Sequence, residues 1–572
     1  MSALMLSDSS HTGQRSHWFA DMFFLCLAAF YALAACNGVV ALSAGGAEMD
    51  SDLSTYAFSM AGHQHPANFV QDEILREATP ANSFWNLQQF LAQHLTPGDQ
   101  YAVGLFRVGA LAIFTFYAGA YLLGRWLFGP PGIAALLALC MGITIWVGWG
   151  DFWGIVHSDP VPRVIFSCCW LFLLMALISA MERPWLRPPV MLTTGLAMWV
   201  HGLSALGCGA MFFTAFALHR PKGLTFSGHL LQLMLCLCCY FVPVLLFLWP
   251  SLGQSSPFSL AELDTFKELF DLRWQKDYGR LGERIMLFLD PGEVRLWILC
   301  GGFLGWLAVL AWGKPKARQL ATMYPAFWLA LICVTLFSWL EGLYAARVGR
   351  LPLGHELVRN LRFLSPLSWL MIVGAVAIIW PHLQGLWGRL FRMGIVTGML
   401  FAIILFSQDR QHVAALYSLS QSTGFHLPRS LQKKVEETHQ QALAHRDALD
   451  SLRRLSSPGD LVFSNTGDMG VRHLALRGLG HTFKDGSHPF YNKKPDQART
   501  WLEYETLMRS GPLGYLEAWQ RSGALWLLST RLQDREAIAR LGEIVWENQG
   551  WIIARRYREA FSTPSAAGQN SF

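Results

Sequence analysis

Long apolar runs recur through the first 408 residues and restrict the fold more than any other feature of the sequence. The hydrocarbon core of a bilayer is about 30 Å thick, and about eleven of these runs are long enough, or nearly so, to cross it as helices. Their limits are 20–43, 103–126, 131–149, 164–181, 189–203, 204–219, 229–250, 294–312, 321–343, 364–380 and 392–408. The pair 189–203 and 204–219 is short and is equally consistent with one broken hairpin. Because the chain is 53% hydrophobic and only 15% charged, we predict an all-α polytopic membrane domain.

Lysine and arginine gather in one of the two alternating sets of loops between these runs. That set, whose one acid is Glu182, contains Arg125, Arg183, Arg187, Arg220, Lys222, Lys314, Lys316, Arg318, Arg389 and Arg392. Positively charged loops face the cytoplasm. We therefore expect a cytoplasmic N-terminus, with the first run as an uncleaved signal anchor. An odd number of spans then places the C-terminal region outside, which in a bacterium is the periplasmic side of the inner membrane.

The chain divides at about residue 408. Before it lies the transmembrane domain, with outer segments at 44–102, 251–293 and 344–363; "LAELDTFKELFDLRWQKDYGRLGERI" in the second predicts an amphipathic helix on the membrane surface. Residues 409–572 have the composition of a small soluble α/β domain. Helices are expected at 430–455 and in "PDQARTWLEYETLM", strands in "PGDLVFSN" and "ALWLLST", a hairpin in "EIVWENQGWIIARRY", and a disordered tail in "STPSAAGQNSF".

The sequence argues against several kinds of site. All 11 cysteines lie in or beside apolar runs and are expected to be buried apolar side chains, with neither a disulfide framework nor a zinc site. We find no P-loop, GxGxxG, His-Glu-x-x-His or Gly-x-Ser-x-Gly motif, and nothing that points to a nucleic-acid partner. The stretch "LALRGLGHTFKDGSHPFYNKKPDQARTWLEYETLM" is rich in Lys, His and aromatic residues. That composition suits contact with sugar or lipid phosphate, and equally any wet surface.

Three acids follow the first apolar run at once: Glu48, Asp50 and Asp52. They are consistent with an ordinary wet loop, but "DLSTYAFSMAG" predicts a helix that begins at Asp52, where the helix dipole favours an anion. Tyr56 follows one turn later on the same face. A carboxylate placed at the membrane edge is suited to act as a general base on a hydroxyl.

The spacing from Asp52 to Tyr56-Ala57 resembles a motif of the GT-C class of polyprenyl-phosphate-sugar-dependent membrane glycosyltransferases. Protein O-mannosyltransferases and the aminoarabinose transferases of lipid A belong to this class. The resemblance implies a GT-C-like fold, with Asp52 as the catalytic residue and Tyr56 close to the substrate. Their motif has a second acid directly after the first, and here Leu53 takes that place. Asp50 or Glu48 is the candidate to compensate.

A second point of resemblance is Asp159-Pro160, in "GWGDFWGIVHSDPVPRV", where the fourth span begins. The resemblance implies that Asp159 holds the head group of donor or acceptor, with His157 as a weaker substrate-binding candidate. Asp159 is equally suited to cap the following helix, with Pro160 at its first position. Both roles are compatible with each other.

Arginines cluster in the outer segment 344–363, against the positive-inside bias. They are Arg347, Arg350, Arg359 and Arg362, and Glu356 is the one acid of this segment. The planar guanidinium reaches two phosphate oxygens at once. The resemblance implies that Arg347, Arg359 and Arg362 bind the phosphate of the polyprenyl carrier. The alternative is contact with anionic lipid head groups.

Together these features predict a membrane enzyme that transfers a sugar from a polyprenyl-phosphate donor to an unknown lipid, glycan or protein acceptor on the extracytoplasmic side. Membrane lipids are the other expected partners. No cofactor is certain: a divalent metal would suit the phosphate, although a single clear acid at the motif argues against it. The alternatives are an O-antigen ligase or polymerase, a transporter of lipid-linked sugars, and a non-catalytic subunit of an envelope assembly.

Overall fold

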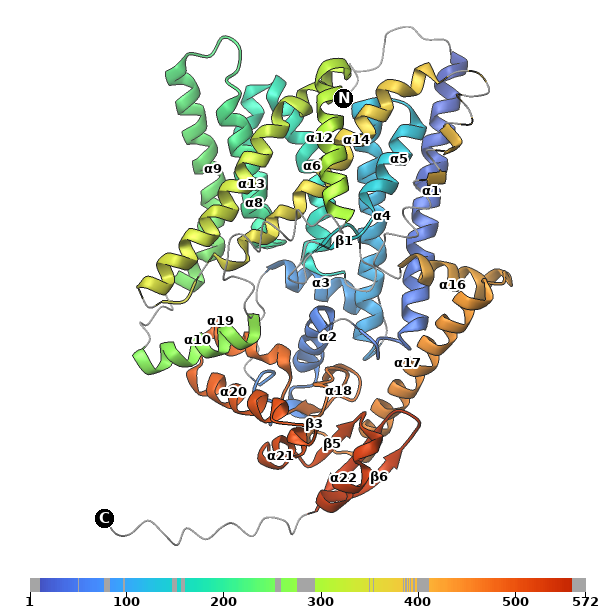
Figure 1. The fold of residues 1–572 in the computed structure, drawn as a ribbon, viewed down its shortest axis with the longest axis vertical. Coiled ribbons are helices and arrows are strands. Elements are labelled where there is room, and N and C mark those ends of the chain that lie inside the picture. Colours follow the sequence, from blue (N-terminus) through green and yellow to red (C-terminus); the bar gives the residue numbers. More distant parts are fainter. Residues whose placement is uncertain are drawn as a thin grey trace.

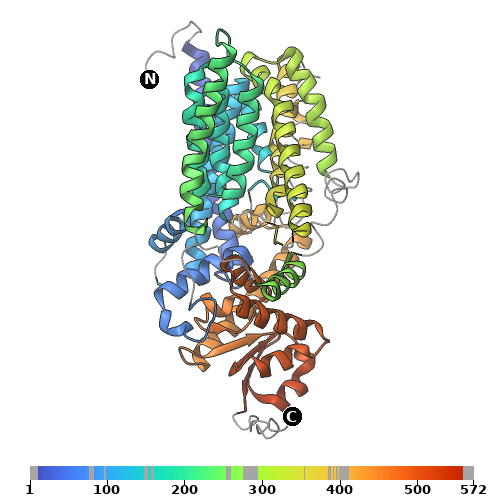
Figure 2. The same ribbon diagram turned by 90° about the vertical axis from the view of Figure 1, so that its left-hand side faces the viewer.

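The computed structural model describes residues 11–49, 51–76, 83–95, 98–146, 152–155, 160–252, 259–274, 294–348, 350–352, 354–383 and 411–557, with a few single positions between 385 and 398. Long helices run side by side in a bundle, and the C-terminal region packs against one end of it (Figures 1 and 2). We call that end the domain end.

Among the described residues, seven helical segments are long and apolar enough to cross a membrane. They correspond to α1 (His11–Leu42), α4 (Tyr101–Phe128), α6 (Pro162–Glu182), α9 (Phe226–Leu252), α12 (Val294–Trp312), α13 (Pro315–Arg347) and α14 (Leu364–Ile379) with the 3-10 helices η5 (His355–Phe363) and η6 (Trp380–His382) on either side. The shorter bundle helices are α5 (Pro131–Met141), α7 (Arg187–Leu196) and α8 (Gly202–Leu218). The expectation of a largely helical region with several membrane spans is confirmed, while the number of about eleven spans stays a prediction. Most of the run predicted at 392–408 lies outside the described residues.

The pair α7 and α8 forms a broken hairpin, as one of the two sequence interpretations expected. The 3-10 helix η2 (Pro184–Leu186) precedes α7, and a second one, η3 (Ala197–Trp199), follows it before His201 caps α8 by accepting a hydrogen bond from the Ser204 amide at 3.3 Å. At the other end the buried Arg187 donates to the carbonyl of His219 at 2.9 Å. This bond satisfies a carbonyl that the end of α8 leaves without a helical partner.

The predicted span 131–149 is too long. Helix α5 ends at Met141, and the chain then forms the short strand β1 (Ile145–Trp146), which pairs antiparallel with β2 (Phe152–Trp153). Trp153 is fully buried against Trp170 of α6, with ring centroids 5.2 Å apart. An aromatic residue packed in this way anchors the turn, so this segment folds back at the domain end instead of extending the helix.

The basic loops lie at the end of the bundle opposite the domain end (Figure 1). Arg125 of α4 pairs with Asp21 of α1 at 2.7 Å, and Lys314 donates to the carbonyl of Phe128 at 2.5 Å. The two alternating sets of loops are therefore separated in space, as their charges predicted. Which end faces the cytoplasm stays a prediction.

Several short elements cover the domain end of the bundle: α2 (Ser51–Gln64), η1 (Pro66–Phe69), α3 (Ser83–His94) and α10 (Leu260–Trp274). Helix α10 corrects one prediction. Its apolar face does not rest on a membrane surface, because Phe266, Phe270 and Trp274 pack in one core with Trp501 and Leu502 of the C-terminal region. An amphipathic pattern predicts that the apolar face of a helix is covered, but it does not tell whether a membrane or another part of the protein covers it.

The C-terminal region is an α/β unit. Its five-stranded sheet has the order β4-β3-β5-β7-β6, in which β3 is parallel to β4 and β5 while β5, β7 and β6 are antiparallel. The strands are β3 (Leu461–Ser464), β4 (Gly478–Leu479), β5 (Trp526–Ser529), β6 (Gly542–Glu547) and β7 (Ile552–Arg556). The helices are α16 (Gln411–Thr423), α17 (Arg429–Leu455), α18 (Gly470–His473), η7 (Phe483–Gly486), α19 (Ser487–Asn492), α20 (Pro495–Arg509), α21 (Gly514–Arg521), η8 (Leu532–Asp534) and α22 (Arg535–Leu541). The predicted long helix, strands and hairpin are confirmed, and the predicted tail lies outside the described residues.

Two ion-pair groups, each centred on a buried cationic side chain, fasten this unit to the segments that follow α1, and we call them the docking seam. The guanidinium of Arg472 is fully buried and lies 2.7 Å from both Asp72 and Asp485. Burial alone would lower the pKa of Arg472, but the two carboxylates outweigh it and raise that pKa above its ordinary value. These contacts hold the first outer segment against the sheet.

The second group of the docking seam is centred on His445 of α17. Its imidazole lies 2.8 Å from Glu48 and 2.5 Å from Asp468, and its ring stacks on Trp551. Burial alone would lower the pKa of His445, but Asp468 and Glu48 outweigh it and raise the pKa to about 9. Glu48, one of the three acids after the first span, is therefore a docking residue.

Candidate active site

The carboxylate of Asp52 lies where the bundle meets the C-terminal region. Asp52 is in the first turn of α2, as predicted. One oxygen lies 3.2 Å from Arg163 at the start of α6, and the other contacts Lys484 in η7. The Asp52 side chain is nevertheless 30% exposed. Asp52 thus joins three distant parts of the chain and stays open to a substrate.

Four arginines and a lysine lie along this junction, and we call them the basic cluster: Arg163, Arg273, Arg359, Arg362 and Lys484. His201 lies within electrostatic reach of Arg163, Arg359 and Arg362. Arg273 of α10 lies within electrostatic reach of Arg359. Cations from α6, α10 and η5 therefore lie near one another, and Lys484 of η7 is connected to Arg163 through Asp52.

Each arginine of η5 has a defined setting. Arg362 is 3% exposed and donates a hydrogen bond to the hydroxyl of Ser204. Ser204 lies in the first turn of α8, just after the break between α7 and α8. Arg359 pairs with Glu356, one helical turn away, at 3.3 Å. Since η5 leads directly into α14, these side chains are held by a rigid element, which suits a site that must keep its geometry.

An aromatic wall adjoins the basic cluster. The guanidinium of Arg273 lies 4.6 Å from the ring of Phe483 and 5.5 Å from that of Trp274. Trp274 in turn packs against Phe490, with ring centroids 4.6 Å apart. Burial lowers the pKa of Arg273. Its buried Nε has no hydrogen-bond partner among the described residues, so this donor remains available to a ligand.

An apolar groove of about 680 Å³ runs between α6 and α7. It is lined by Cys169, Phe172, Leu173, Ala176, Ser179, Leu186, Pro189, Val190, Thr193, Leu196, Ala197 and Val200. The two hydroxyl groups, of Ser179 and Thr193, each donate to a carbonyl of their own helix at 2.9 Å, so the groove presents hydrocarbon. At one end it reaches Val200, the neighbour of His201, and thus lies close to the basic cluster.

The predicted site residues have different neighbours in the structure. Asp52 contacts Arg163, whereas Arg359 and Arg362 lie with Arg163 around His201, so the convergence of Asp52 with these two arginines stays a prediction. Tyr56 lies one turn after Asp52, packed partly into the bundle core. Arg347 does not join them: it is exposed at the end of α13. Arg350 pairs with Glu341 of α13 at 2.7 Å.

Three predicted substrate-binding residues, Asp50, His157 and Asp159, lie outside the described residues. Their proposed roles in substrate binding therefore stay predictions, whereas the capping role of Asp159 is wrong, because Val161 is the residue that caps α6. Pro160 is described and precedes α6, whose first residue is Pro162. The proline at the first helical position is thus Pro162, two residues later than the sequence suggested.

Three members of the basic cluster were not singled out from the sequence. The sequence could have pointed to Arg163, because a positively charged residue at the outer end of a span runs against the positive-inside bias. Arg273 lies in the segment predicted for the membrane surface. Lys484 lies in the stretch that was rich in Lys, His and aromatic residues, and nothing local marks it as the partner of Asp52.

The sequence left a divalent metal open at this site, and the described part of the chain gives two observations on it. Within it no three His, Cys, Asp or Glu side chains come together as ligands. Both oxygens of Asp52 are also occupied by cationic groups, Arg163 and Lys484. All 11 cysteines are free thiols, but the expectation that all of them are buried is wrong for four, because Cys26, Cys238, Cys300 and Cys333 are exposed.

The chain resembles a solved structure in its fold, but it matches no known family in its sequence. No family model and no curated protein matches the sequence. Among solved structures, the crystal structure of ArnT from Cupriavidus metallidurans bound to undecaprenyl phosphate is similar: the match covers 96% of this chain and 99% of that one, with a TM-score of 0.50 and 14% sequence identity. At this identity the likeness shows the fold alone, and the chain is accordingly a multi-pass membrane protein with an ArnT-like fold.

Proposed function

We propose that this protein is a membrane glycosyltransferase that moves a sugar from a polyprenyl-phosphate donor to a hydroxyl acceptor. The observation that carries the proposal is the position of Asp52, in contact with Arg163 and Lys484 of the basic cluster. A carboxylate with cationic groups beside it is what a base and a phosphate leaving group require. The similar solved structure is of a protein bound to undecaprenyl phosphate, which agrees with such a donor.

Each charged group has a role in this reaction. The acceptor hydroxyl displaces one cationic partner of Asp52 and gives its proton to the carboxylate as it attacks the anomeric carbon, which inverts. The bond to the phosphate breaks, and negative charge grows on the departing phosphate oxygen. Arg362 and Arg359 stabilise that charge from fixed positions, which is where preorganised donors contribute most. No step uses a metal.

The apolar groove between α6 and α7 supports a lipid donor. A prenyl chain laid along this groove would be in contact with hydrocarbon over its length. Its head group would emerge near Val200, beside His201 and the basic cluster. Asp50, Tyr56, His157, Asp159 and Arg347 complete the proposed substrate-binding set.

The proposed orientation follows from the loop charges. The domain end, with Asp52 and the C-terminal region, faces the periplasm or the cell exterior, and the basic loops face the cytoplasm. The donor then enters from the outer leaflet of the plasma membrane. A cysteine introduced near residue 470 is expected to react with an impermeant thiol reagent from outside intact cells, and reaction only after lysis would overturn this orientation.

The test of the function is the substitution Asp52→Asn, which removes the charge and keeps the shape. We expect release of undecaprenyl phosphate from undecaprenyl-phosphate hexose, with a membrane extract as acceptor source, to fall by about 10²–10⁴-fold. Asp21→Asn is the matched control, because it also breaks a carboxylate–arginine pair, at the other end of the bundle. Transfer by Asp52→Asn at the wild-type rate would contradict the proposal and favour a non-catalytic assembly subunit.

A further inference from the structure

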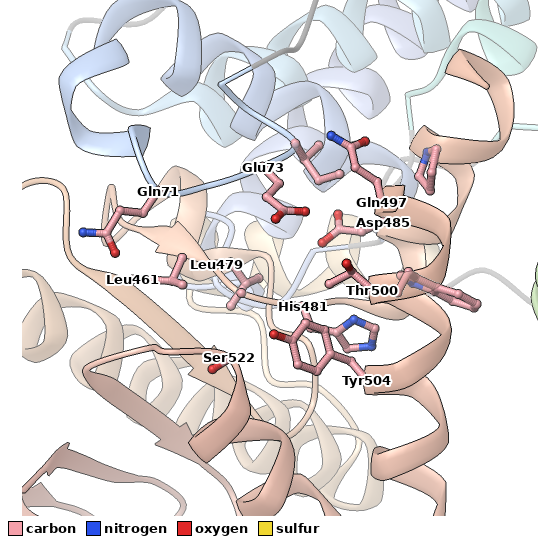
Figure 3. Close-up of a pocket in the computed structure, with 14 residues that line it drawn as sticks. Gln71, Glu73, Leu461, Leu479, His481, Asp485, Gln497, Thr500, Tyr504 and Ser522 are labelled. Carbon is pink, nitrogen blue, oxygen red and sulfur yellow. The ribbon is translucent and has the colours of Figure 1, made fainter. Parts of the chain in front are cut away.

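A second cavity, of about 140 Å³, lies between the first outer segment and the C-terminal region, away from the bundle. Figure 3 shows the side chains that line it, among them Glu73 from the outer segment and Asp485, Thr500 and Tyr504 from the C-terminal region. Its other labelled residues include Gln71, His481, Gln497 and Ser522. The proposed transfer reaction uses none of these residues.

Two polar groups of this cavity are available to a ligand. The carboxylate of Glu73 is exposed and makes no hydrogen bond or ion pair within the described part of the chain, and the hydroxyl of the half-buried Tyr504 makes no hydrogen bond there. Burial and the nearby charges of Glu503 and Glu73 raise the pKa of Tyr504, so its hydroxyl is kept protonated and able to donate. The cavity thus offers an acceptor and a donor to a ligand.

The wall around these groups is rigid. His481 lies 3.2 Å from Glu505, and Trp501 donates its indole N–H to the carbonyl of Thr482 at 3.0 Å. Asp485 is held by the buried Arg472 of the docking seam. A site whose side chains are already fixed loses little conformational entropy when a ligand binds.

The chemistry of the lining selects among ligands. Carboxylate, amide, hydroxyl and imidazole groups stand beside the rings of Trp501 and Tyr504, a mixture that suits a hydroxyl-rich ring with apolar C–H faces. The lining contains neither Lys nor Arg, so a phosphate or another anion would find no opposite charge. The volume suits a single sugar ring.

The position of the cavity connects it to the reaction site. In η7, Lys484 contacts Asp52, while the next residue, Asp485, lines the cavity. From this juxtaposition we infer that the cavity binds a hexose ring that does not itself react. On the proposed function, on which this assignment rests, that ring belongs to a carbohydrate acceptor whose attacking hydroxyl extends to Asp52.

The test is a binding measurement on the full-length protein in nanodiscs. Saturation-transfer NMR would follow methyl α-glucoside, methyl α-galactoside and methyl α-mannoside. We expect at least one of them to bind saturably, and to bind about fivefold to tenfold more weakly to Glu73→Gln and Tyr504→Phe, each of which removes one hydrogen-bonding group. Glu503→Gln is the matched control, because this neighbour on α20 is 53% exposed and pairs with Arg521.

The outcomes separate this inference from the proposed function. Binding by none of the three hexosides, or equal binding to Glu73→Gln, Tyr504→Phe and the control, would overturn the hexose site. Asp52→Asn is expected to bind the hexoside like the wild type while losing transfer. If Asp52→Asn keeps transfer and the hexoside still binds through Glu73, the proposed function fails and the hexose site stands.

Discussion

The docking seam and the basic cluster lie at the same junction but differ in their balance of charge. In the seam, carboxylates outnumber cations: Arg472 lies between two acids, and so does His445. In the basic cluster, the described carboxylates in contact are Asp52 and Glu356, against four arginines and a lysine. The seam is also the more deeply buried of the two, with Arg472 and Asp72 fully enclosed.

This difference in charge suggests that the docking seam serves stability, whereas the basic cluster serves ligand binding. A buried charge is tolerated when opposite charges and hydrogen bonds surround it, and removing one partner then costs stability. Among the described residues, the basic cluster has more cations than carboxylates, and an entering anion would reduce the repulsion between those cations. We therefore expect substitutions in the seam to weaken folding, and substitutions in the basic cluster to weaken ligand binding and activity.

The largest effect on stability is expected from Arg472→Met. The substitution leaves Asp72 and Asp485 buried together without a cation, which costs about 3–5 kcal/mol. Thermal unfolding in detergent, with protease resistance of the C-terminal region as a second readout, measures the loss. Adding Asp72→Asn and Asp485→Asn to Arg472→Met is expected to recover much of it. A stable single variant would show that the seam does not hold the two parts together.

Arg362→Gln in the basic cluster is expected to weaken ligand binding rather than folding. A charge-assisted hydrogen bond to phosphate contributes about 1.5–3 kcal/mol, so the Kd for undecaprenyl phosphate should rise by about 10- to 100-fold. The unfolding temperature should fall much less than in Arg472→Met, because the side chain of Gln can still donate a hydrogen bond to Ser204 and leaves no buried pair of carboxylates without a cation. Loss of stability with unchanged affinity would place Arg362 with the seam and break the comparison.

Local sequence patterns predicted the parts of this junction that depend on neighbours in the chain. The helix that carries Asp52 and Tyr56 was predicted from an acid in its first turn, and the arginines of η5 from charges on the outer side of the membrane. The strands "LVFS" and "WLLS" and the final hairpin were predicted from apolar runs bounded by turn residues.

The pairings between distant segments could not be predicted in this way. Arg472 and Asp72 are 400 positions apart, and their contact depends on how the sheet packs against the outer segment. The same packing pairs Lys484 with Asp52 and covers α10 with α20. Charge and periodicity show that a residue needs a partner or a cover, whereas the docking of whole units decides which one it receives.

A smaller effect on stability is expected from pH at the other part of the seam. The pKa of His445 is raised to about 9 in the folded protein, above its ordinary value, so its stabilising contribution is complete below about pH 6.5 and is lost as the pH rises through 9. Because Glu48 is half exposed, we expect a loss of about 1–2 kcal/mol over this range.

The measurement is thermal unfolding of the wild type and of His445→Gln between pH 6.5 and 9. The variant should lose the slope, while His439→Gln, on the same helix and with no carboxylate partner among the described residues, should keep it. His473 does not contribute above pH 6.5, since burial lowers its pKa to about 4 and it stays neutral throughout. An unchanged slope in His445→Gln would remove this histidine from the seam.

The smallest effect is expected from Arg347→Gln, which sharpens the comparison within one outer segment. Arg347 is exposed at the end of α13 and is held by neither the seam nor the basic cluster. An exposed charge contributes about 0.5 kcal/mol or less, so stability should not change measurably, and the Kd for undecaprenyl phosphate should shift by about twofold at most. That shift should disappear in high salt, because long-range attraction between exposed charges is screened. A tenfold loss of affinity, equal to that of Arg362→Gln, would instead place Arg347 in direct contact with the phosphate and extend the basic cluster to the end of α13.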